Sequence, residues 1–142
     1  MTIARLIAGR DTEVWSIEAE DTVADAVAML ASKRIGALPV RDGGTHVVGI
    51  FSERDVLYCL QTRGADMLQL KVREVMTAPA ITIDPATHVD EALGLMTRRR
   101  IRHLPVEKDG KVIGFVSIGD LVKYKIDTIQ AEAEALRSYI AS

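Results

Sequence analysis

The hydrophobic positions of this chain follow one pattern twice. Residues 15–55 and 81–120 correspond at an offset of 66 positions, which falls to 65 after one extra residue near His46. In each copy a short apolar run precedes apolar residues spaced i, i+3, i+4 and i+7, which predicts a strand and then a helix with one buried face. A repeat of this length does not easily close its own core. We therefore expect two copies to pack face to face, with any function located in the cleft between them.

Each copy is expected to fold as strand, helix, strand, strand, helix. The two helix stripes consist of Val23, Ala26, Val27 and Leu30, and of Val89, Ala92, Leu93 and Met96. The expected strands cover residues 14–17, 37–41 and 46–51, and then 80–83, 104–107 and 111–116. Gly36 is expected to end the first helix, and glycine-containing turns join the last two strands of each copy as hairpins. The pattern predicts an α/β (α+β) fold with small sheets covered by helices on at least one face.

The segments outside the repeated core are also related to each other. Residues 3–7 and 72–76 carry matching apolar positions and form a lead-in before each copy. Residues 62–69 include a glycine and mixed polar residues, and we interpret them as the linker. The chain is thereby divided into a first repeat at residues 1–65 and a second at residues 66–142, each with its lead-in.

The last helix is longer than the repeat requires. Its apolar residues are spaced 4-3-4-3-4, at Val122, Ile126, Ile129, Ala133, Leu136 and Ile140. This is the spacing of a heptad seam, although it covers fewer than three heptads. One interpretation is a helix that packs its stripe on its own domain. The other is a contact between subunits, which we favour because the duplicated core is complete without this segment.

Composition narrows the class of protein. Nearly half of the 142 residues are apolar, but only two Phe and one Trp are present, so the core must be aliphatic. The net charge of −2 provides no basic footprint for nucleic acid. No apolar run approaches the ~20 residues that span a bilayer, and the N-terminus lacks the apolar core of a signal peptide. We expect a cytoplasmic protein that binds neither nucleic acid nor membrane.

The strongest local signal is Gly-x-x-Ser-x-x-Asp, which occurs at residues 49–55 and again at 114–120. Ser is a favoured N-cap, and an acid three positions later suits the first helical turn, so capping alone explains the pattern. The same helix start offers amide groups and a positive dipole end to a phosphate. The carboxylate can accept two hydrogen bonds from the diol of a ribose. Because the motif occurs in both copies, it favours nucleotide binding at both helix starts.

A basic cluster at residues 98–103 is the second candidate for chemistry. Arg98 and Arg99 are explained by the favourable effect of cations at a helix C-terminus. Arg102 and His103 lie beyond that helix, where their side chains are candidates to reach a phosphate. We therefore expect the second copy to hold an anionic mononucleotide better than the first.

The first copy lacks these donors, because it has Gly and Ala at residues 36–37. It would rely instead on Arg54, which stands in its helix start, or on the basic pair at residues 33–34. Ser16 and Thr82 occupy matching places at the first strands of the two copies, where a hydroxyl is ordinary but is also suited to contact a base or a phosphate.

The sequence provides no positive reason to propose catalysis. Three scattered histidines and the single Cys59 do not have the spacing of metal ligands. No P-loop, no dinucleotide fingerprint, and no Ser/His/Asp or paired-carboxylate arrangement is readable from the spacing. We expect no metal, no catalytic cofactor and no enzymatic activity.

These motifs resemble a tandem pair of CBS domains (cystathionine β-synthase domains). The resemblance covers roughly residues 1–125 and rests on residues 36–40, 48–55, 102–106 and 113–120, with a lead-in at 75–77. More narrowly, the chain resembles small stand-alone bacterial proteins that consist only of a CBS pair. The resemblance implies a pseudo-twofold module with two clefts and its association into a disc-like homodimer or a higher homo-oligomer. It also implies an adenine-containing ligand, such as AMP, ADP, ATP, S-adenosylmethionine or NAD(H).

The resemblance implies roles for individual residues as well. The two acids of the motif hold the ribose hydroxyls, and the two serines face the phosphate. Residues of the first strands line the base and phosphate region, and the residues before Leu-Pro flank the base or the phosphate. The complete expected set is Asp120, Ser117, Thr82, Ile83, Arg102, His103, Pro105, Asp55, Ser52, Arg54, Ser16, Ile17 and Ala37.

Three functions compete at this point. The doubled motif favours a regulatory module that binds an adenine nucleotide, senses energy or redox state, and signals by a change of conformation or assembly. The heptad-spaced helix supports a structural or interaction scaffold whose clefts bind nothing. A nucleotide-processing enzyme ranks last. Nucleotide binding that depends on Asp120 would separate the first two, and turnover of the nucleotide would favour the third.

Overall fold

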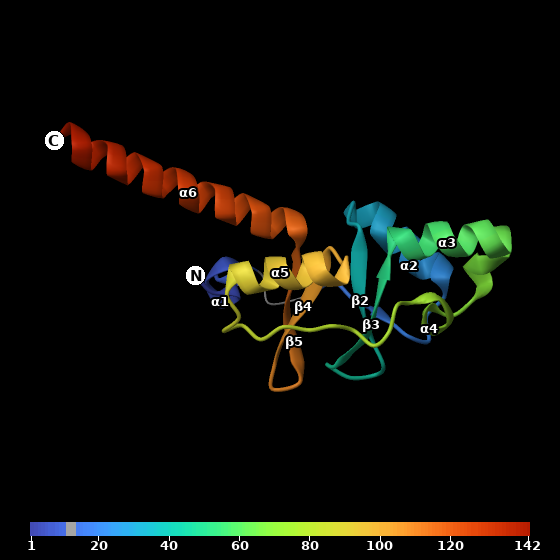
Figure 1. Cartoon of the computed structure of the whole chain (residues 1–142). Coiled ribbons are helices and arrows are strands. Elements are labelled where there is room, and N and C mark those ends of the chain that lie inside the picture. The colour runs from blue at the N-terminus through green and yellow to red at the C-terminus, as the bar shows by residue number, and fades with distance from the viewer. Residues whose placement is uncertain (11–13) are drawn as a thin grey trace.

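The computed structural model describes residues 1–10 and 14–142. The first repeat contains β1 (Ile17–Glu18), α2 (Val23–Lys33), β2 (Ala37–Arg41), β3 (Val47–Ser52) and α3 (Glu53–Arg63). The second repeat contains α5 (Val89–Arg99), β4 (His103–Lys108), β5 (Lys111–Ser117) and α6 (Ile118–Ala141). Three short helices precede or connect them: α1 (Ile3–Ile7), the 3-10 helix η1 (Gly64–Gln69) and α4 (Val72–Val75). Figure 1 shows the strands of both repeats standing in the middle of the molecule, with helices beside them.

The strands form two small sheets, as the sequence predicts. In the first, β1 pairs in parallel with β2, and β2 pairs antiparallel with β3. In the second, β4 and β5 form the equivalent hairpin. The expected strand at residues 80–83 is reduced to one bridge, between Ile83 and Val106. Pro79 and Pro85 flank this segment, and they lack the N–H groups that a longer strand would use for pairing.

The helix boundaries follow local capping chemistry. Ser52 caps α3 and Ser117 caps α6, and each forms a capping box with the Asp three residues later, as the motif predicts. The end of α2 differs from the expectation. This helix terminates at Arg34, two residues before Gly36, because the backbone of Arg34 turns into the left-handed region with φ of 53°.

The segment interpreted as a linker is more ordered than the sequence suggests. Helix α3 continues to Arg63, and η1 follows it directly over residues 64–69. Met67 of η1 is buried against the first repeat. The polar composition of this segment suggested a linker, but the buried side chain of Met67 attaches it to the core of the first repeat.

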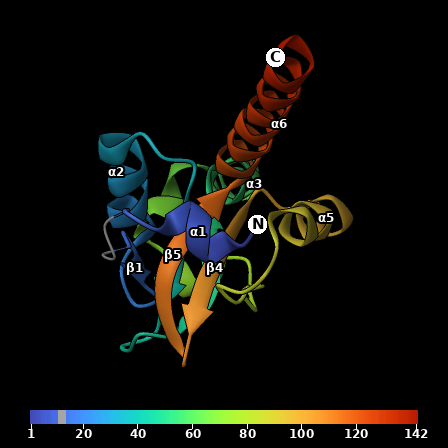
Figure 2. The ribbon, with the colours of Figure 1, turned by 90° about the vertical axis from the view of Figure 1, so that its left-hand side faces the viewer.

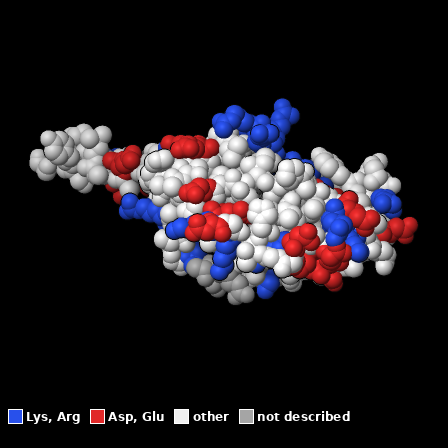
Figure 3. All heavy atoms as spheres, turned by 90° about the horizontal axis from the view of Figure 1, so that it is seen from below, with Lys and Arg blue, Asp and Glu red and all other residues white. Residues whose placement is uncertain are grey.

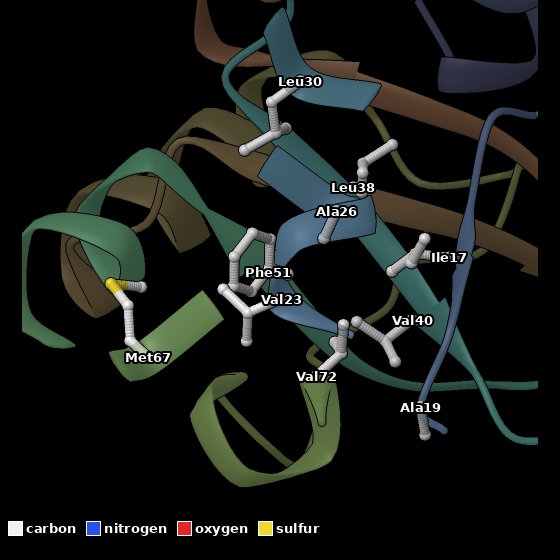
Figure 4. Close-up of a cluster of buried hydrophobic side chains, with 10 residues drawn as sticks. All are labelled: Ile17, Ala19, Val23, Ala26, Leu30, Leu38, Val40, Phe51, Met67 and Val72. Atoms are coloured by element: carbon white, nitrogen blue, oxygen red, sulfur yellow. The ribbon is translucent and has the colours of Figure 1, made fainter. Parts of the chain in front are cut away.

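Buried aliphatic side chains form two clusters, one for each repeat. The first cluster, shown in Figure 4, consists of Ile17, Ala19, Val23, Ala26, Leu30, Leu38, Val40, Phe51, Met67 and Val72. The second consists of Ile3, Ile83, Val89, Ala92, Met96, Leu104, Val106, Val116 and Leu121. Both helix stripes expected from the sequence contribute to these clusters, so the predicted buried faces are confirmed.

The lead-in helices are exchanged between the two clusters. Helix α1 precedes the first repeat in sequence, yet Ile3 is fully buried in the second cluster, where its N–H donates to the carbonyl of Thr87 at 2.8 Å. Helix α4 precedes the second repeat, yet Val72 is fully buried in the first cluster, where its N–H donates to the carbonyl of Asp21 at 2.8 Å. Each repeat therefore completes its core with a helix that leads into the other.

Helix α6 extends far beyond the core. Its 24 residues span about 36 Å, and Figures 1 and 2 show it projecting from the body of the molecule to the C-terminus. Leu121 near its start is buried, whereas Ile126, Ile129 and Leu136 are exposed. The interpretation of this stripe as packing on its own domain is wrong beyond the first turns. Within the described residues, no helix combines the length and apolar character needed to cross a membrane.

Candidate functional site

A cavity of about 460 Å³ lies where the two repeats meet. The first repeat supplies the end of β3, the start of α3 and Gly36, and the second supplies the segment before α5 and the end of that helix. The lining residues are Gly36, Ile50, Ser52, Glu53, Arg54, Asp55, Thr77, Pro79, Ala80, Ile81, Arg99, Arg100, Ile101, Arg102 and His103. Its volume lies within the usual range for small-molecule sites.

The start of α3 presents an oriented carboxylate to this cavity. The backbone N–H of Ser52 donates to Oδ2 of Asp55 at 2.8 Å, and the backbone N–H of Asp55 donates to the Ser52 hydroxyl at 3.4 Å. On the other side, the hydroxyl of Thr77 donates to Oδ1 of Asp55 at 2.9 Å. Both carboxylate oxygens therefore have fixed donors, and the side chain is held in one orientation at the wall.

The opposite wall carries the basic cluster. Arg99 ends α5, Arg100 follows with a left-handed backbone at φ of 54°, and Arg102 lies just before β4. The two walls are joined by one side chain, because Nη1 of Arg54 donates to the carbonyl of Arg100 at 3.4 Å. Arginines from both repeats thus lie around the same space.

His103 begins β4 at the edge of the cavity. Its ring stacks on Phe115 of β5, with centroids 5.4 Å apart and the planes inclined by 15°. Burial lowers the pKa of His103, which nearby Asp120 and Glu53 raise in part and Arg102 lowers further. The imidazole therefore favours its neutral form. Gly36 faces this ring: a Cβ built on Gly36 would lie 3.6 Å from Cε1 of His103, so the glycine leaves space between them.

The helix start of the second repeat lies outside this cavity. Asp120 accepts from the backbone N–H of Ser117 at 2.9 Å, and its carboxylate pairs with the guanidinium of Arg10 at 3.3 Å. Trp15 follows Arg10 in the sequence, and Nζ of Lys33 lies 4.8 Å from the centroid of its ring. The two Ser-x-x-Asp motifs therefore have different neighbours, a hydroxyl in the first and a guanidinium in the second.

Arg102 and His103 lie next to the Ser-x-x-Asp motif of their own repeat, as the sequence predicts: His103 pairs with Ser117, and the N–H of Ile118 donates to the carbonyl of Arg102 at 2.8 Å. The sequence placed Arg102 and His103 with the Ser-x-x-Asp motif of their own repeat, and gave that repeat the better anion site. In the structure both residues also line the cavity of Ser52 and Asp55, to which both repeats contribute. The prediction that Arg54 serves the first cleft agrees with its position in this wall.

The remaining expected residues are dispersed. Thr82 and Ile83 line a second depression together with Asp84, Asp90 and Glu91. The others lie in or next to the strands: Ile17 and Ala37 are buried, Ser16 precedes β1, and Pro105 pairs with Phe115.

Sequence reasoning missed several lining residues, namely Gly36, Ile50, Glu53, Thr77, Pro79, Ala80, Ile81, Arg99, Arg100 and Ile101. Thr77 and Pro79 follow the lead-in helix α4, and a signal for them existed, since that segment was recognised as part of the repeated pattern. The sequence analysis explained the arginines at the end of α5 by the helix dipole. The dipole accounts for their place in the helix but does not show that Arg99 and Arg100 line the cavity. Across the described ranges 1–10 and 14–142, no three His, Cys, Asp or Glu side chains are grouped to hold a metal ion.

Two repeats that share the order helix, strand, strand, helix, with a cavity lined by both, define a paired-repeat module whose site lies between the halves. A family model for the CBS domain matches residues 10–62 and 72–127. The chain belongs to the CBS-domain family.

Similar proteins agree with this assignment. The mitochondrial CBS domain-containing protein CBSX3 of Arabidopsis thaliana is 41% identical over 125 residues, which cover 85% of this chain and 61% of that protein. The chain thus spans less than two thirds of the length of this relative. A crystal structure of a CBS-domain containing protein from Agrobacterium tumefaciens is 32% identical, with a TM-score of 0.83 and coverage of 88% of this chain and 99% of that one. A structure of CBSX2 in complex with AMP is 27% identical, with a TM-score of 0.76 and coverage of 89% and 97%.

Proposed function

We propose that the chain is a regulatory module that binds an adenine nucleotide in the cavity between its repeats. The observation that carries the proposal is that the Ser52–Asp55 helix start of the first repeat and Arg102 and His103 of the second line one cavity. The complex of CBSX2 with AMP supports the choice of an adenine nucleotide. AMP, ADP, ATP and NAD(H) are the candidate ligands, and the proposed role is regulatory rather than catalytic.

Each part of a nucleotide has a partner in this cavity. The carboxylate of Asp55 is placed to accept the hydroxyls of a ribose, in exchange for the hydroxyl of Thr77. The positive end of α3 and the Ser52 hydroxyl are suited to a phosphate. The apolar side chains Ile50 and Ile81 offer a surface for the flat base.

Signalling would follow from the shared walls of the cavity. A ligand that contacts both repeats stabilises their closed arrangement, and it shifts the equilibrium by its difference in affinity for two states. A chain of contacts leads from the cavity to α6, because His103 stacks on Phe115 of β5 and β5 continues directly into α6. A shift at His103 would therefore reach the projecting helix.

The stripe of α6 supports self-association as the output. The side chains at its heptad positions are exposed, and the largest exposures are at Leu136 and Ile140. In a parallel pair of these helices Glu132 of one copy would face Arg137 of the other, since the two residues are five positions apart. We propose a homodimer, or a higher homo-oligomer, that uses this helix. The cytoplasmic location expected from the sequence stays a prediction.

The test compares the two acids of the repeated motif. Calorimetric titration of AMP into wild type, Asp55→Ala and Asp120→Ala should show that Asp55→Ala loses roughly 2–4 kcal/mol of binding free energy, because two hydrogen bonds to a charged acceptor disappear. Asp120→Ala is the matched control, since it removes the same capping contact in the other repeat and should retain most of the affinity.

Three outcomes would contradict the proposal. If no adenine nucleotide binds the protein after bound ligand has been removed by refolding, the scaffold hypothesis replaces it. If nucleotide binds and chromatography shows that it is converted, the protein is an enzyme. Equal losses in both variants would show that the cavity at Asp55 is not the principal site.

A further inference from the structure

The charges that line the cavity are unevenly balanced. The basic residues are Arg54, Arg99, Arg100 and Arg102, and the acids are Glu53 and Asp55. The whole chain carries a net charge of −2, so this excess of cations is local to the site. Figure 3 shows Lys and Arg side chains gathered at one edge, near the middle of the molecule. A local positive field of this kind raises the affinity for anionic ligands.

The arginines come from two elements, and the guanidinium of Arg54 reaches the carbonyl of Arg100 at 3.4 Å. Arg54 belongs to the first turn of α3, beside Ser52, whereas Arg99 and Arg100 belong to the end of α5. A phosphate at the start of α3 is served by the Ser52 hydroxyl and the helix end. A monophosphate in this place would leave the guanidinium groups at the end of α5 without an anionic partner, while a longer chain would meet them.

The backbone conformation of Arg100 supports a role for this residue in ligand binding. Its φ of 54° lies in the left-handed region, where glycine is the favoured residue at a helix C-terminus. Arg34 of the first repeat shares this conformation, so the turn itself belongs to the fold. What distinguishes Arg100 is that it lines the cavity. A long cationic side chain kept in an unfavourable backbone conformation beside a binding site points to a role for that side chain.

We propose that this cavity prefers adenosine ligands with a chain of two or more phosphates, and that Arg99 and Arg100 bind the phosphates beyond the first. The proposal rests on the proposed function, because it assumes that the nucleoside occupies the site at Asp55. Guanidinium groups suit this task, since each can donate two parallel hydrogen bonds to one phosphate. ATP, ADP and a dinucleotide such as NAD share this chemistry.

Calorimetric titrations with AMP, ADP, ATP and NAD, at one ionic strength and without divalent cations, test the preference. We expect ATP to bind at least tenfold more tightly than AMP, with ADP between them. The double variant Arg99→Gln/Arg100→Gln should reduce the affinity for ATP to near that for AMP, a larger loss than it causes for AMP. NAD separates the sources of the phosphate chain: binding like ADP favours a dinucleotide, and binding like AMP favours a free polyphosphate end.

Arg98→Gln is the matched control, because it removes the same charge from the same helix but faces the second depression of Thr82 and Asp84. It should leave the ratio of ATP to AMP affinity unchanged. Arg100→Gly provides a second control: it keeps the backbone conformation without strain, so the protein should be at least as stable while ATP binds more weakly.

The failures of the two proposals are distinguishable. If AMP binds in an Asp55-dependent manner and equals ATP in affinity, only the phosphate preference is overturned. If Arg98→Gln weakens ATP binding as much as the double variant does, the preference is a general charge effect and the assignment to Arg99 and Arg100 is wrong. If no adenine nucleotide binds at all, the proposed function fails and this proposal fails with it.

Discussion

At the scale of single residues, His103 is a side chain that residues of both repeats surround. Its ring lies beside Gly36 of the first repeat and stacks on Phe115 of the second. Burial lowers its pKa, Asp120 and Glu53 oppose that effect, and Arg102 adds to it. The protonated form is therefore less favourable in the folded protein than in the unfolded chain, whose histidine pKa is about 6.5.

This shift predicts the pH dependence of stability. Between the lowered pKa and about 6.5 the unfolded chain binds more protons, so the free energy of unfolding should fall as the pH drops below about 6.5. Urea denaturation of wild type and His103→Phe, measured from pH 7.5 to 5.5, should show a smaller loss in the variant, which keeps an aromatic ring on Phe115 but has no proton to bind. Equal losses would assign the pH dependence to other groups.

At the scale of elements, what the sequence predicted correctly was local. The hairpins, the buried helix stripes and the caps at Ser52 and Ser117 depend on residues a few positions apart, and all are present. Which segments face each other across the cleft depends on how two similar halves are rotated together. Neither the spacing nor the composition of residues 98–103 contains that information, so the sequence did not show that Arg102 also lines the cavity at the helix start of the first repeat. The exchange of α1 and α4 between the two cores could not be predicted for the same reason.

The exchange predicts an effect at a distance in sequence. Ile3→Ala should destabilise the protein by about 2–4 kcal/mol, because it removes a fully buried side chain from the core of the second repeat. Hydrogen exchange should show the loss of protection first in α5 and β4, rather than in the strands of the repeat that follows α1. Leu57→Ala, at an exposed position of α3, is the control and should change stability by no more than about 0.5 kcal/mol. Loss of protection confined to β1 and β2 would contradict the exchanged arrangement.

At the scale of the whole molecule, α6 consists of a first part that packs on the core and a second part that projects from it. Its first turns hold the core through Leu121, and Lys125 pairs with Asp90 at 2.8 Å. The remainder has no partner within the described part of the chain for its apolar stripe. A helix of this length that is exposed on its apolar side gains little from its own propensity and is stabilised chiefly by packing.

Removal of residues 126–142 should therefore lower the mass in solution and leave the fold intact. Light scattering at several protein concentrations measures the first effect, and circular dichroism with a urea titration measures the second. Ile129→Asp in the full chain should have the same effect on mass, because it places a charge in the seam. An unchanged mass in both variants would exclude this helix as the contact between subunits.

The exchanged lead-in helices have a further consequence for how the molecule can be divided. A cut between the repeats, near residue 65, would leave each fragment with an empty groove and a spare helix that fits the groove of the other. The two fragments should thus reassemble when mixed, and either one alone should pair with a second copy of itself. Each repeat therefore depends on a helix from the other to complete its core. Residues of both repeats are needed to form the cavity between them.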